Sequence, residues 1–127
     1  MLKKWSNLQI DLEFLSFRIV NFFRKKGFVT KLHQFDNDRL EIIALQPHAS
    51  GRIKVKVIKK DSNVTIDFRV EENKLIKSLG NLLTFFGLGF LFLANVQFLE
   101  TAIRVETEFW PFLEEVIDTF RKNNVEV

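Results

Sequence analysis

Only a few residues of this 127-residue sequence have types and spacings that could support catalysis or metal binding. The two histidines, His33 and His48, lie in a predicted strand and a predicted loop, and their spacing does not match that of paired metal ligands. His33 has a side chain of the type that titrates near neutral pH, but the residues around it indicate no role for that titration. We therefore expect both histidines to be ordinary structural or surface residues.

The carboxylate pairs and the glycines are equally weak as catalytic signals. Glu71–Glu72 and Glu114–Glu115 are adjacent residues in predicted helices, where neighbouring side chains point apart and cannot form an acid/base pair. The segment FFGLGF at 85–90 lacks the Lys-Ser/Thr, or the third glycine, of a phosphate-binding loop. The sequence also has no cysteine, which excludes disulfides, thiolate metal sites and cysteine nucleophiles. We therefore expect a protein that is not an enzyme and that binds no cofactor or metal.

A run of basic residues on one predicted strand is the clearest pattern of charge. Its members alternate with apolar residues, so their side chains share one face of the predicted sheet. Such a face can bind phosphates, but sheets that bind nucleic acid usually also present aromatic side chains, and this face has none. Asp67 neutralises part of the face, so we expect a solvated surface with cross-strand ion pairs and no nucleic-acid partner. The candidate basic face comprises Arg52, Lys54, Lys56, Lys59, Lys60 and Arg69.

The composition indicates a single folded domain over residues 1–127. The chain is 46% hydrophobic and contains 15 phenylalanines, and its net charge of +3 is only a mild bias. A first helix is predicted from Ser6 to Lys26, with Ser6 and Gln9 as a capping box and Gly27 as the residue that ends it. The N-terminal residues lack the uninterrupted apolar run of a secretion signal, so we expect a cytoplasmic protein.

Two hairpins are predicted to follow this helix. The first joins Phe28–Phe35 to Arg39–Leu45 through a turn at 36–38, where Asp and Asn suit a left-handed backbone. The second joins Arg52–Lys59 to Asn63–Val70, and both of these segments alternate apolar with polar residues. The hairpins together predict a four-stranded antiparallel sheet with one apolar face.

The register of the second hairpin follows from its predicted turn. A two-residue turn at 60–61 would pair Val57 with Val64 and would set Lys54 opposite Asp67 on the outer face.

Helical spacing of apolar residues resumes at Glu71 and continues almost to the end of the chain. Gly87 and Gly89 interrupt it, and Thr107 is a candidate N-cap for a last helix with Pro111 in its first turn. The predicted fold class is therefore α+β. It has an N-terminal helix, a four-stranded antiparallel sheet made of two hairpins, and two or three C-terminal helices packed on one face of the sheet.

The longest uncharged stretch, Ser78–Leu99, carries the main question about function. A helix needs roughly 20 apolar residues to cross a bilayer, and this stretch reaches that length. Polar residues interrupt the stretch, its flanking charges indicate no orientation in a membrane, and predicted amphipathic helices border it. We therefore favour a helical hairpin, bent at 87–89, that lies in a soluble core or in a dimer interface. The residues that we expect at this interface, or in an apolar pocket, are Phe85, Phe86, Phe90, Phe92, Asn81, Thr84, Asn95 and Gln97.

These patterns favour one function and leave two alternatives open. We expect a small non-catalytic interaction or assembly module that self-associates through the hairpin 78–99 and the terminal helices, as a homodimer or with a partner protein. One alternative is a membrane-associated protein that inserts residues 78–99. The other is a carrier of an apolar small molecule or lipid, whose pocket the phenylalanines would line.

Overall fold

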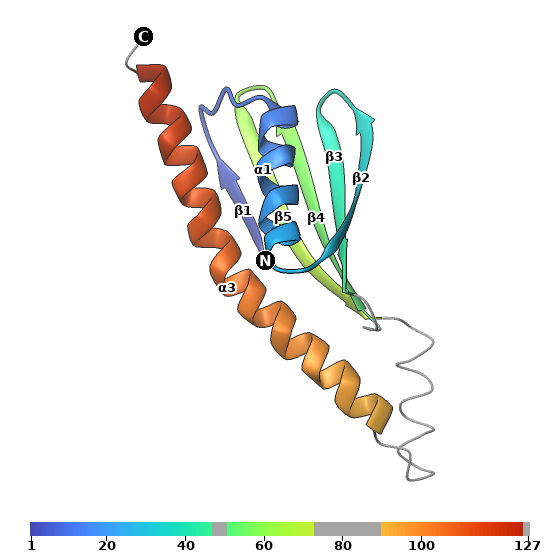
Figure 1. Ribbon diagram of the computed structural model, residues 1–127. Coiled ribbons are helices and arrows are strands. Elements are labelled where there is room, and N and C mark those ends of the chain that lie inside the picture. Colours follow the sequence, from blue (N-terminus) through green and yellow to red (C-terminus); the bar gives the residue numbers. More distant parts are fainter. Residues whose placement is uncertain (47–50, 73–89, 126–127) are drawn as a thin grey trace.

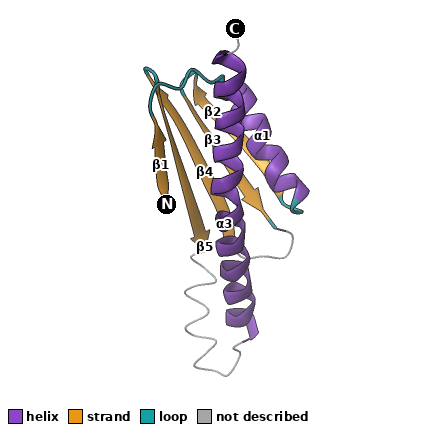
Figure 2. Ribbon diagram, turned by 90° about the vertical axis from the view of Figure 1, so that its left-hand side faces the viewer, coloured by secondary structure: helices purple, strands orange, loops and turns teal. Residues whose placement is uncertain are grey.

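Five antiparallel strands form one sheet, and two helices cover one of its faces (Figure 1). The computed structural model describes residues 1–46, 51–72 and 90–125. The strand order is β1-β5-β4-β3-β2, so β1 and β2 form the two edges of the sheet. Both helices lie on the same side of the sheet (Figure 2), and no described helix covers the other side. The elements are β1 (Leu2–Trp5), α1 (Leu12–Lys25), β2 (Val29–Asp36), β3 (Arg39–Leu45), β4 (Gly51–Lys60), β5 (Asn63–Glu72) and α3 (Phe90–Val125).

The α+β class is correct, but the predicted count of four strands is wrong. The described part of the chain contains a fifth strand, β1, in which Leu2 lies opposite Asp67 and Trp5 lies opposite Val64 of β5. Four residues carry too little periodicity to indicate a strand, and their partner strand lies far away in the sequence. This strand forms only because β5 offers it an open edge.

Helix α1 begins at Leu12 and not near Ser6 as predicted. Asp11 is its N-cap, and the Asp11 carboxylate accepts a hydrogen bond of 3.1 Å from the backbone N–H of Glu13. The predicted capping box is therefore wrong. The side-chain amide of Gln9 instead donates to a hydroxyl in the β4–β5 turn at 3.0 Å, which ties the segment before α1 to the sheet.

Two predictions about chain reversals are confirmed. Gly27 follows α1 with a φ of 87°, a left-handed conformation that glycine adopts without a steric penalty. Strands β2 and β3 form the predicted first hairpin. The carboxylate of Asp36 accepts a hydrogen bond of 2.8 Å from the backbone N–H of Asp38 and so stabilises its turn.

The second hairpin has the predicted strands but a different register. Its turn is at 61–62, where Asp61 adopts a φ of 57°, and Lys54 consequently lies opposite Arg69 rather than Asp67. The shift moves the pairing by two positions, so every side chain keeps its predicted face of the sheet. Strand β5 also continues through Glu72, where the sequence pattern predicts the start of a helix.

The prediction of two or three C-terminal helices is wrong for the described residues, which contain one long helix, α3. Thr107 lies inside this helix and donates its hydroxyl to the carbonyl of Ile103 at 2.9 Å, so it is not an N-cap. Pro111 is also interior. The bend predicted at Gly87–Gly89, and the helix predicted before it, lie outside the described residues. Neither described helix is long and apolar enough to cross a membrane.

Aromatic rings fill the space between the helices and the sheet. Phe109 of α3 lies 5.1 Å from Phe68 of β5 and 5.9 Å from Phe23 of α1, measured between ring centroids, and all three are at most 1% exposed. Trp5 of β1 contacts Trp110 of α3 at 6.4 Å between ring centroids. The two helices and the edge strand β1 are therefore joined through one aromatic core.

Candidate interaction surfaces

The face of the sheet opposite the helices carries a network of paired charges. Glu71 accepts from Arg52 Nε at 2.7 Å and lies 3.1 Å from Lys54 Nζ, and Lys54 also lies 3.3 Å from Glu41. The side chains of Lys54 and Glu41 are only 17% and 10% exposed. Arg69 is paired separately with Asp67 at 2.7 Å. Much of the positive charge predicted for this face is therefore neutralised within the protein.

The network shifts the pKa values of two of its members. Hydrogen bonding to Glu71 raises the pKa of the Lys54 ammonium above its ordinary value, outweighing the desolvation that lowers it. Burial acts to raise the pKa of Glu71, but the hydrogen bonds from Arg52 and Lys54 and their charges outweigh it and leave that pKa below its ordinary value. Both shifts favour the charged forms, so the network holds its ion pairs throughout the neutral pH range.

The six residues of the candidate basic face do not all lie on the same side of the sheet. Lys56 shares the outer face with the paired residues, because it lies on β4 in the same alternation as Lys54. Lys59 lies on the opposite side, where its ammonium donates to the backbone carbonyl of Ile10 at 3.3 Å. Lys60 is exposed beside the turn. The six residues therefore do not form one continuous patch.

The predicted apolar interface falls largely outside the described part of the chain. Asn81, Thr84, Phe85 and Phe86 lie outside the described residues. Phe90, Phe92, Asn95 and Gln97 belong to the first turns of α3, where the description covers the helical backbone and not these side chains. The expected pairing of the polar residues therefore stays a prediction.

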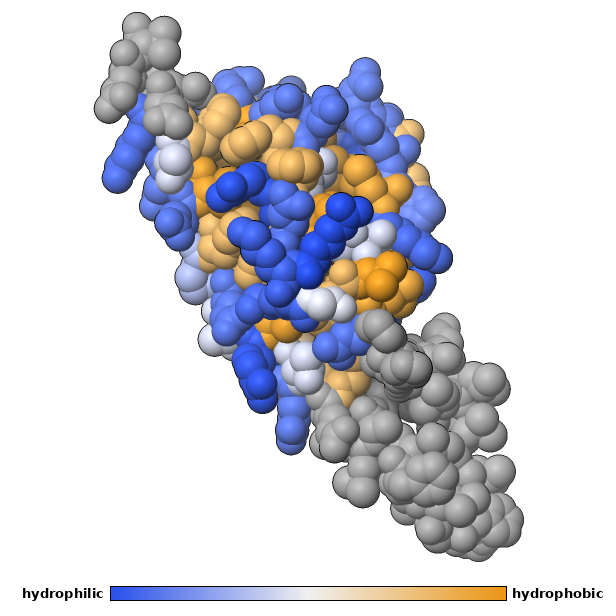
Figure 3. All heavy atoms as spheres, in the orientation of Figure 1, coloured by the Kyte–Doolittle hydropathy of each residue, from blue (hydrophilic) through white to orange (hydrophobic). Residues whose placement is uncertain are grey.

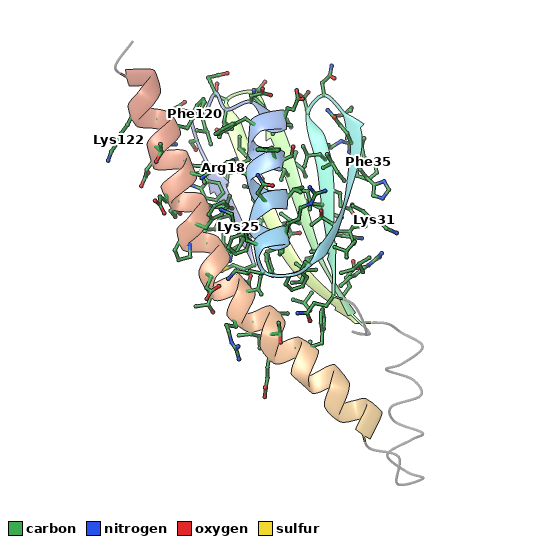
Figure 4. The ribbon with its side chains drawn as sticks, viewed as in Figure 1. Arg18, Lys25, Lys31, Phe35, Phe120 and Lys122 are labelled. Carbon is green, nitrogen blue, oxygen red and sulfur yellow. The ribbon has the colours of Figure 1, made fainter. Side chains whose placement is uncertain are left out.

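A hollow of about 300 Å³ separates α1 from α3 on the helical side of the molecule. The rings of Phe22 and Phe112 stack in it at 4.9 Å, and Lys26 forms an ion pair with Glu108 across it. Arg18 and Lys25 extend from the side of α1 that borders this hollow (Figure 4). Lysines and arginines near the end of a helix interact favourably with its dipole, which accounts for much of this positive charge.

The most unusual surface follows β2, the edge strand that no other described strand continues. Val29, Leu32 and Phe35 are 55%, 49% and 65% exposed. Valine, leucine and phenylalanine are among the residue types that folded proteins most often bury. Their spacing distributes them over both faces of the sheet, with Leu32 on the side of the helices. Figure 4 shows Phe35 and Lys31 on this strand, at the margin of the molecule away from α3.

Helix α1 also carries an exposed apolar residue. Arg24 of α1 donates to the hydroxyl of Thr30 in β2 at 3.3 Å, which identifies the side of α1 that faces β2. Phe17 is 63% exposed and lies two residues from the fully buried Leu15 and Ile19, so its side chain points away from the sheet. Figure 3 shows apolar surface interrupting the charged surface on this part of the helical face.

The outer face carries a second, smaller hollow next to the same strand. It has a volume of about 260 Å³, and Phe35 and Ile58 give it an apolar lining beside the charged groups of Arg39, Glu41 and Lys56. Sequence patterns did not single out this surface, because β2 was predicted as a strand without any indication that it would be an edge. The available signal was the three-residue spacing of Val29, Leu32 and Phe35, which puts apolar side chains on both faces of a strand.

The described residues contain no group of three or more side chains that could hold a metal ion. No protein-family model, no curated protein and no solved structure matches the chain.

Proposed function

We propose that the protein is a non-catalytic interaction module that associates with further copies of itself. The observation that carries the proposal is the group of exposed apolar side chains at the open edge of the sheet, Val29, Leu32 and Phe35. An edge strand also presents backbone N–H and C=O groups that a further strand can pair with. Apolar side chains and backbone groups together form the kind of surface that association covers.

The beginning of α3 supports self-association at a second place. The backbone of this helix begins at Phe90 and runs on past the described strands (Figures 1 and 2). Residues 90–99 carry no charge, and Ile103, which follows them, is 64% exposed. An apolar helix of this kind gains free energy by packing on a second surface. The proposed location is the cytoplasm.

The mass of the full chain in solution tests the proposal. Light scattering during gel filtration, without detergent and over a hundredfold range of concentration, should give twice the mass of one chain at high concentration and a lower average on dilution. A chain that stays monomeric over the whole range contradicts self-association.

The same preparation separates this function from membrane insertion. The protein should remain in the supernatant after high-speed centrifugation and should not float with vesicles of phosphatidylcholine and phosphatidylglycerol. Recovery only in the membrane fraction, or only with detergent, would favour insertion of residues 78–99 and would overturn the proposal.

A further inference from the structure

We propose that two copies of the chain pair through β2 around a two-fold axis at Leu32, which joins their five-stranded sheets into one continuous antiparallel sheet. This inference rests on the proposed self-association and names the surface and the partner.

The backbone groups of Leu32 point out of the sheet. The N–H of Lys59 donates to the carbonyl of Asp38 at 2.7 Å, so even-numbered residues of β3 direct their backbone groups toward β4. The odd-numbered residues of β3 therefore bond to β2, and their partners in β2 are Val29, Lys31 and His33. Successive residues of a strand direct their backbone groups to opposite sides, so the N–H and C=O groups of Thr30, Leu32 and Gln34 point toward the open edge.

A two-fold axis at Leu32 gives a self-complementary set of side chains. Leu32 then meets Leu32 of the second copy on the helical face, where both are half exposed in the single chain. On the outer face, Val29 approaches Phe35 of the second copy at each end, and Lys31 lies opposite His33. The exposed apolar residues of β2 are therefore all paired with apolar residues.

Neighbouring positions for the axis are less favourable. An axis at Lys31 sets two lysines directly opposite each other, and like charges in that arrangement are destabilising. An axis at His33 sets Lys31 opposite Phe35 and sets Leu32 opposite Gln34, so the apolar pairs are lost. The axis at Leu32 is the one that matches apolar with apolar residues and still uses the outward backbone groups.

In a continuous sheet the α1 helices of both copies lie on the same face, on either side of the axis.

Cysteine cross-linking tests the register, and the chain is suited to it because it contains no cysteine. Residues directly opposite in a hydrogen-bonded antiparallel pair have Cα atoms about 5.5 Å apart, within the range of roughly 4.4–6.8 Å that a disulfide spans. Under mild oxidation Leu32→Cys should form a covalent dimer at least tenfold faster than Thr30→Cys or Gln34→Cys alone. An equal mixture of Thr30→Cys and Gln34→Cys should regain fast cross-linking, because these two positions are opposite each other.

Charge substitutions provide the second arm of the test. Leu32→Lys should reduce the mass in solution to that of one chain, whereas Leu2→Lys, at a 58% exposed site on β1 at the opposite edge of the sheet, should leave the dimer intact. Far-ultraviolet circular dichroism confirms that each variant is folded. If the dimer persists but cross-links at other positions, or if Leu32→Lys stays dimeric, the pairing through β2 is wrong while self-association stands. If the unmodified chain is a monomer, the proposed function fails as well.

Discussion

Among single residues, Phe109 is the one on which most of the aromatic core depends. Its ring is fully buried and contacts Phe22, Phe23, Phe68 and Trp110, which belong to α1, β5 and α3. Removing a buried phenylalanine ring costs about 3–5 kcal/mol of folding free energy, through lost burial and the cavity that remains. We predict a loss of that size for Phe109→Ala, measured by urea unfolding followed through tryptophan fluorescence.

Phe14→Ala is the matched control for this prediction. Phe14 is 44% exposed on α1, so its replacement should change the free energy of unfolding by less than about 0.5 kcal/mol. Equal losses for the two variants would mean that Phe109 does not hold the elements together.

Glu71 should make stability depend on pH in the acid range. Burial acts to raise its folded pKa, but the hydrogen bonds from Arg52 and Lys54 outweigh burial and lower it. The contribution of Glu71 to the free energy of unfolding is therefore present above its ordinary pKa of 4.5. The contribution is lost as pH falls through the lower folded value, because protonation removes both ion pairs. Since the side chain is one-third exposed, we expect Glu71→Gln to cost about 0.5–1 kcal/mol at pH 7.

Unfolding curves at pH 7 and at pH values below 4.5 measure this effect. The difference between the unmodified protein and Glu71→Gln should shrink toward zero as the pH is lowered. Glu115→Gln, on the exposed side of α3, is the control and should show a much smaller difference at every pH. A constant difference for Glu71→Gln would contradict the ion-pair account.

Among the elements, α1 is stabilised at its start by Asp11. The Asp11 carboxylate accepts the hydrogen bond of an otherwise unpaired N–H group, and such a cap contributes about 1 kcal/mol. We predict that Asp11→Ala lowers the free energy of unfolding by about that amount. Ser6→Ala, at the position where the sequence pattern placed the cap, should be nearly neutral. The reverse order of the two effects would show that the helix begins earlier.

The packing of α3 on the sheet depends on Gly51 at the start of β4. A Cβ atom at this position would overlap the ring of Phe98 and would come within 3.0 Å of the carbonyl oxygen of Glu71. We predict that Gly51→Ala costs about 1–3 kcal/mol, the usual range for overpacking. Chemical unfolding of the single and double variants measures this cost and its coupling to Phe98.

The double variant separates a clash with the ring from a loss of backbone freedom. In the Phe98→Leu background the cost of Gly51→Ala should fall by more than 0.5 kcal/mol, since residues in contact do not behave additively. A cost that is unchanged in this background would assign the effect to the backbone.

The elements with strong local periodicity were predictable from the sequence. The stripe of α1 and the alternation in β4 and β5 depend on residues a few positions apart, and the α+β class followed from them. β1 was not predictable, because its pairing with β5 is a contact between distant parts of the chain. Thr107 and Pro111 resemble the start of a helix locally, but packing along the sheet lets α3 run through them.

The surfaces were less predictable than the elements. Alternation in β4 put Arg52 and Lys54 on the outer face correctly, but it did not reveal their acidic partners. Glu41 lies on the neighbouring strand, and Glu71 belongs to a segment whose spacing is helical although it forms a strand. The exposure of Leu32 could not be anticipated either, since it follows from the strand order, which makes β2 an edge.

At the scale of the whole molecule, the two edges of the sheet differ in how they are protected. Strand β1 is short and lies close to α3, whose Trp110 contacts Trp5. Strand β2 has eight residues and exposed apolar side chains on both faces, with Lys31 and a bulge near Phe35 as its only described features that oppose uncontrolled pairing. This difference favours one defined pairing between two copies over extended aggregation.

Amide hydrogen exchange at Leu32, measured by nuclear magnetic resonance above and below the concentration at which the protein dissociates, tests this pairing most directly. The Leu32 N–H should be protected at least tenfold more strongly in the dimer than in the dilute monomer, because it gains a hydrogen bond to the second copy. The N–H of Lys31, which faces β3 in both states, should change little and serves as the internal control. Equally fast exchange of Leu32 at both concentrations, with light scattering still reporting a dimer, would contradict association through β2.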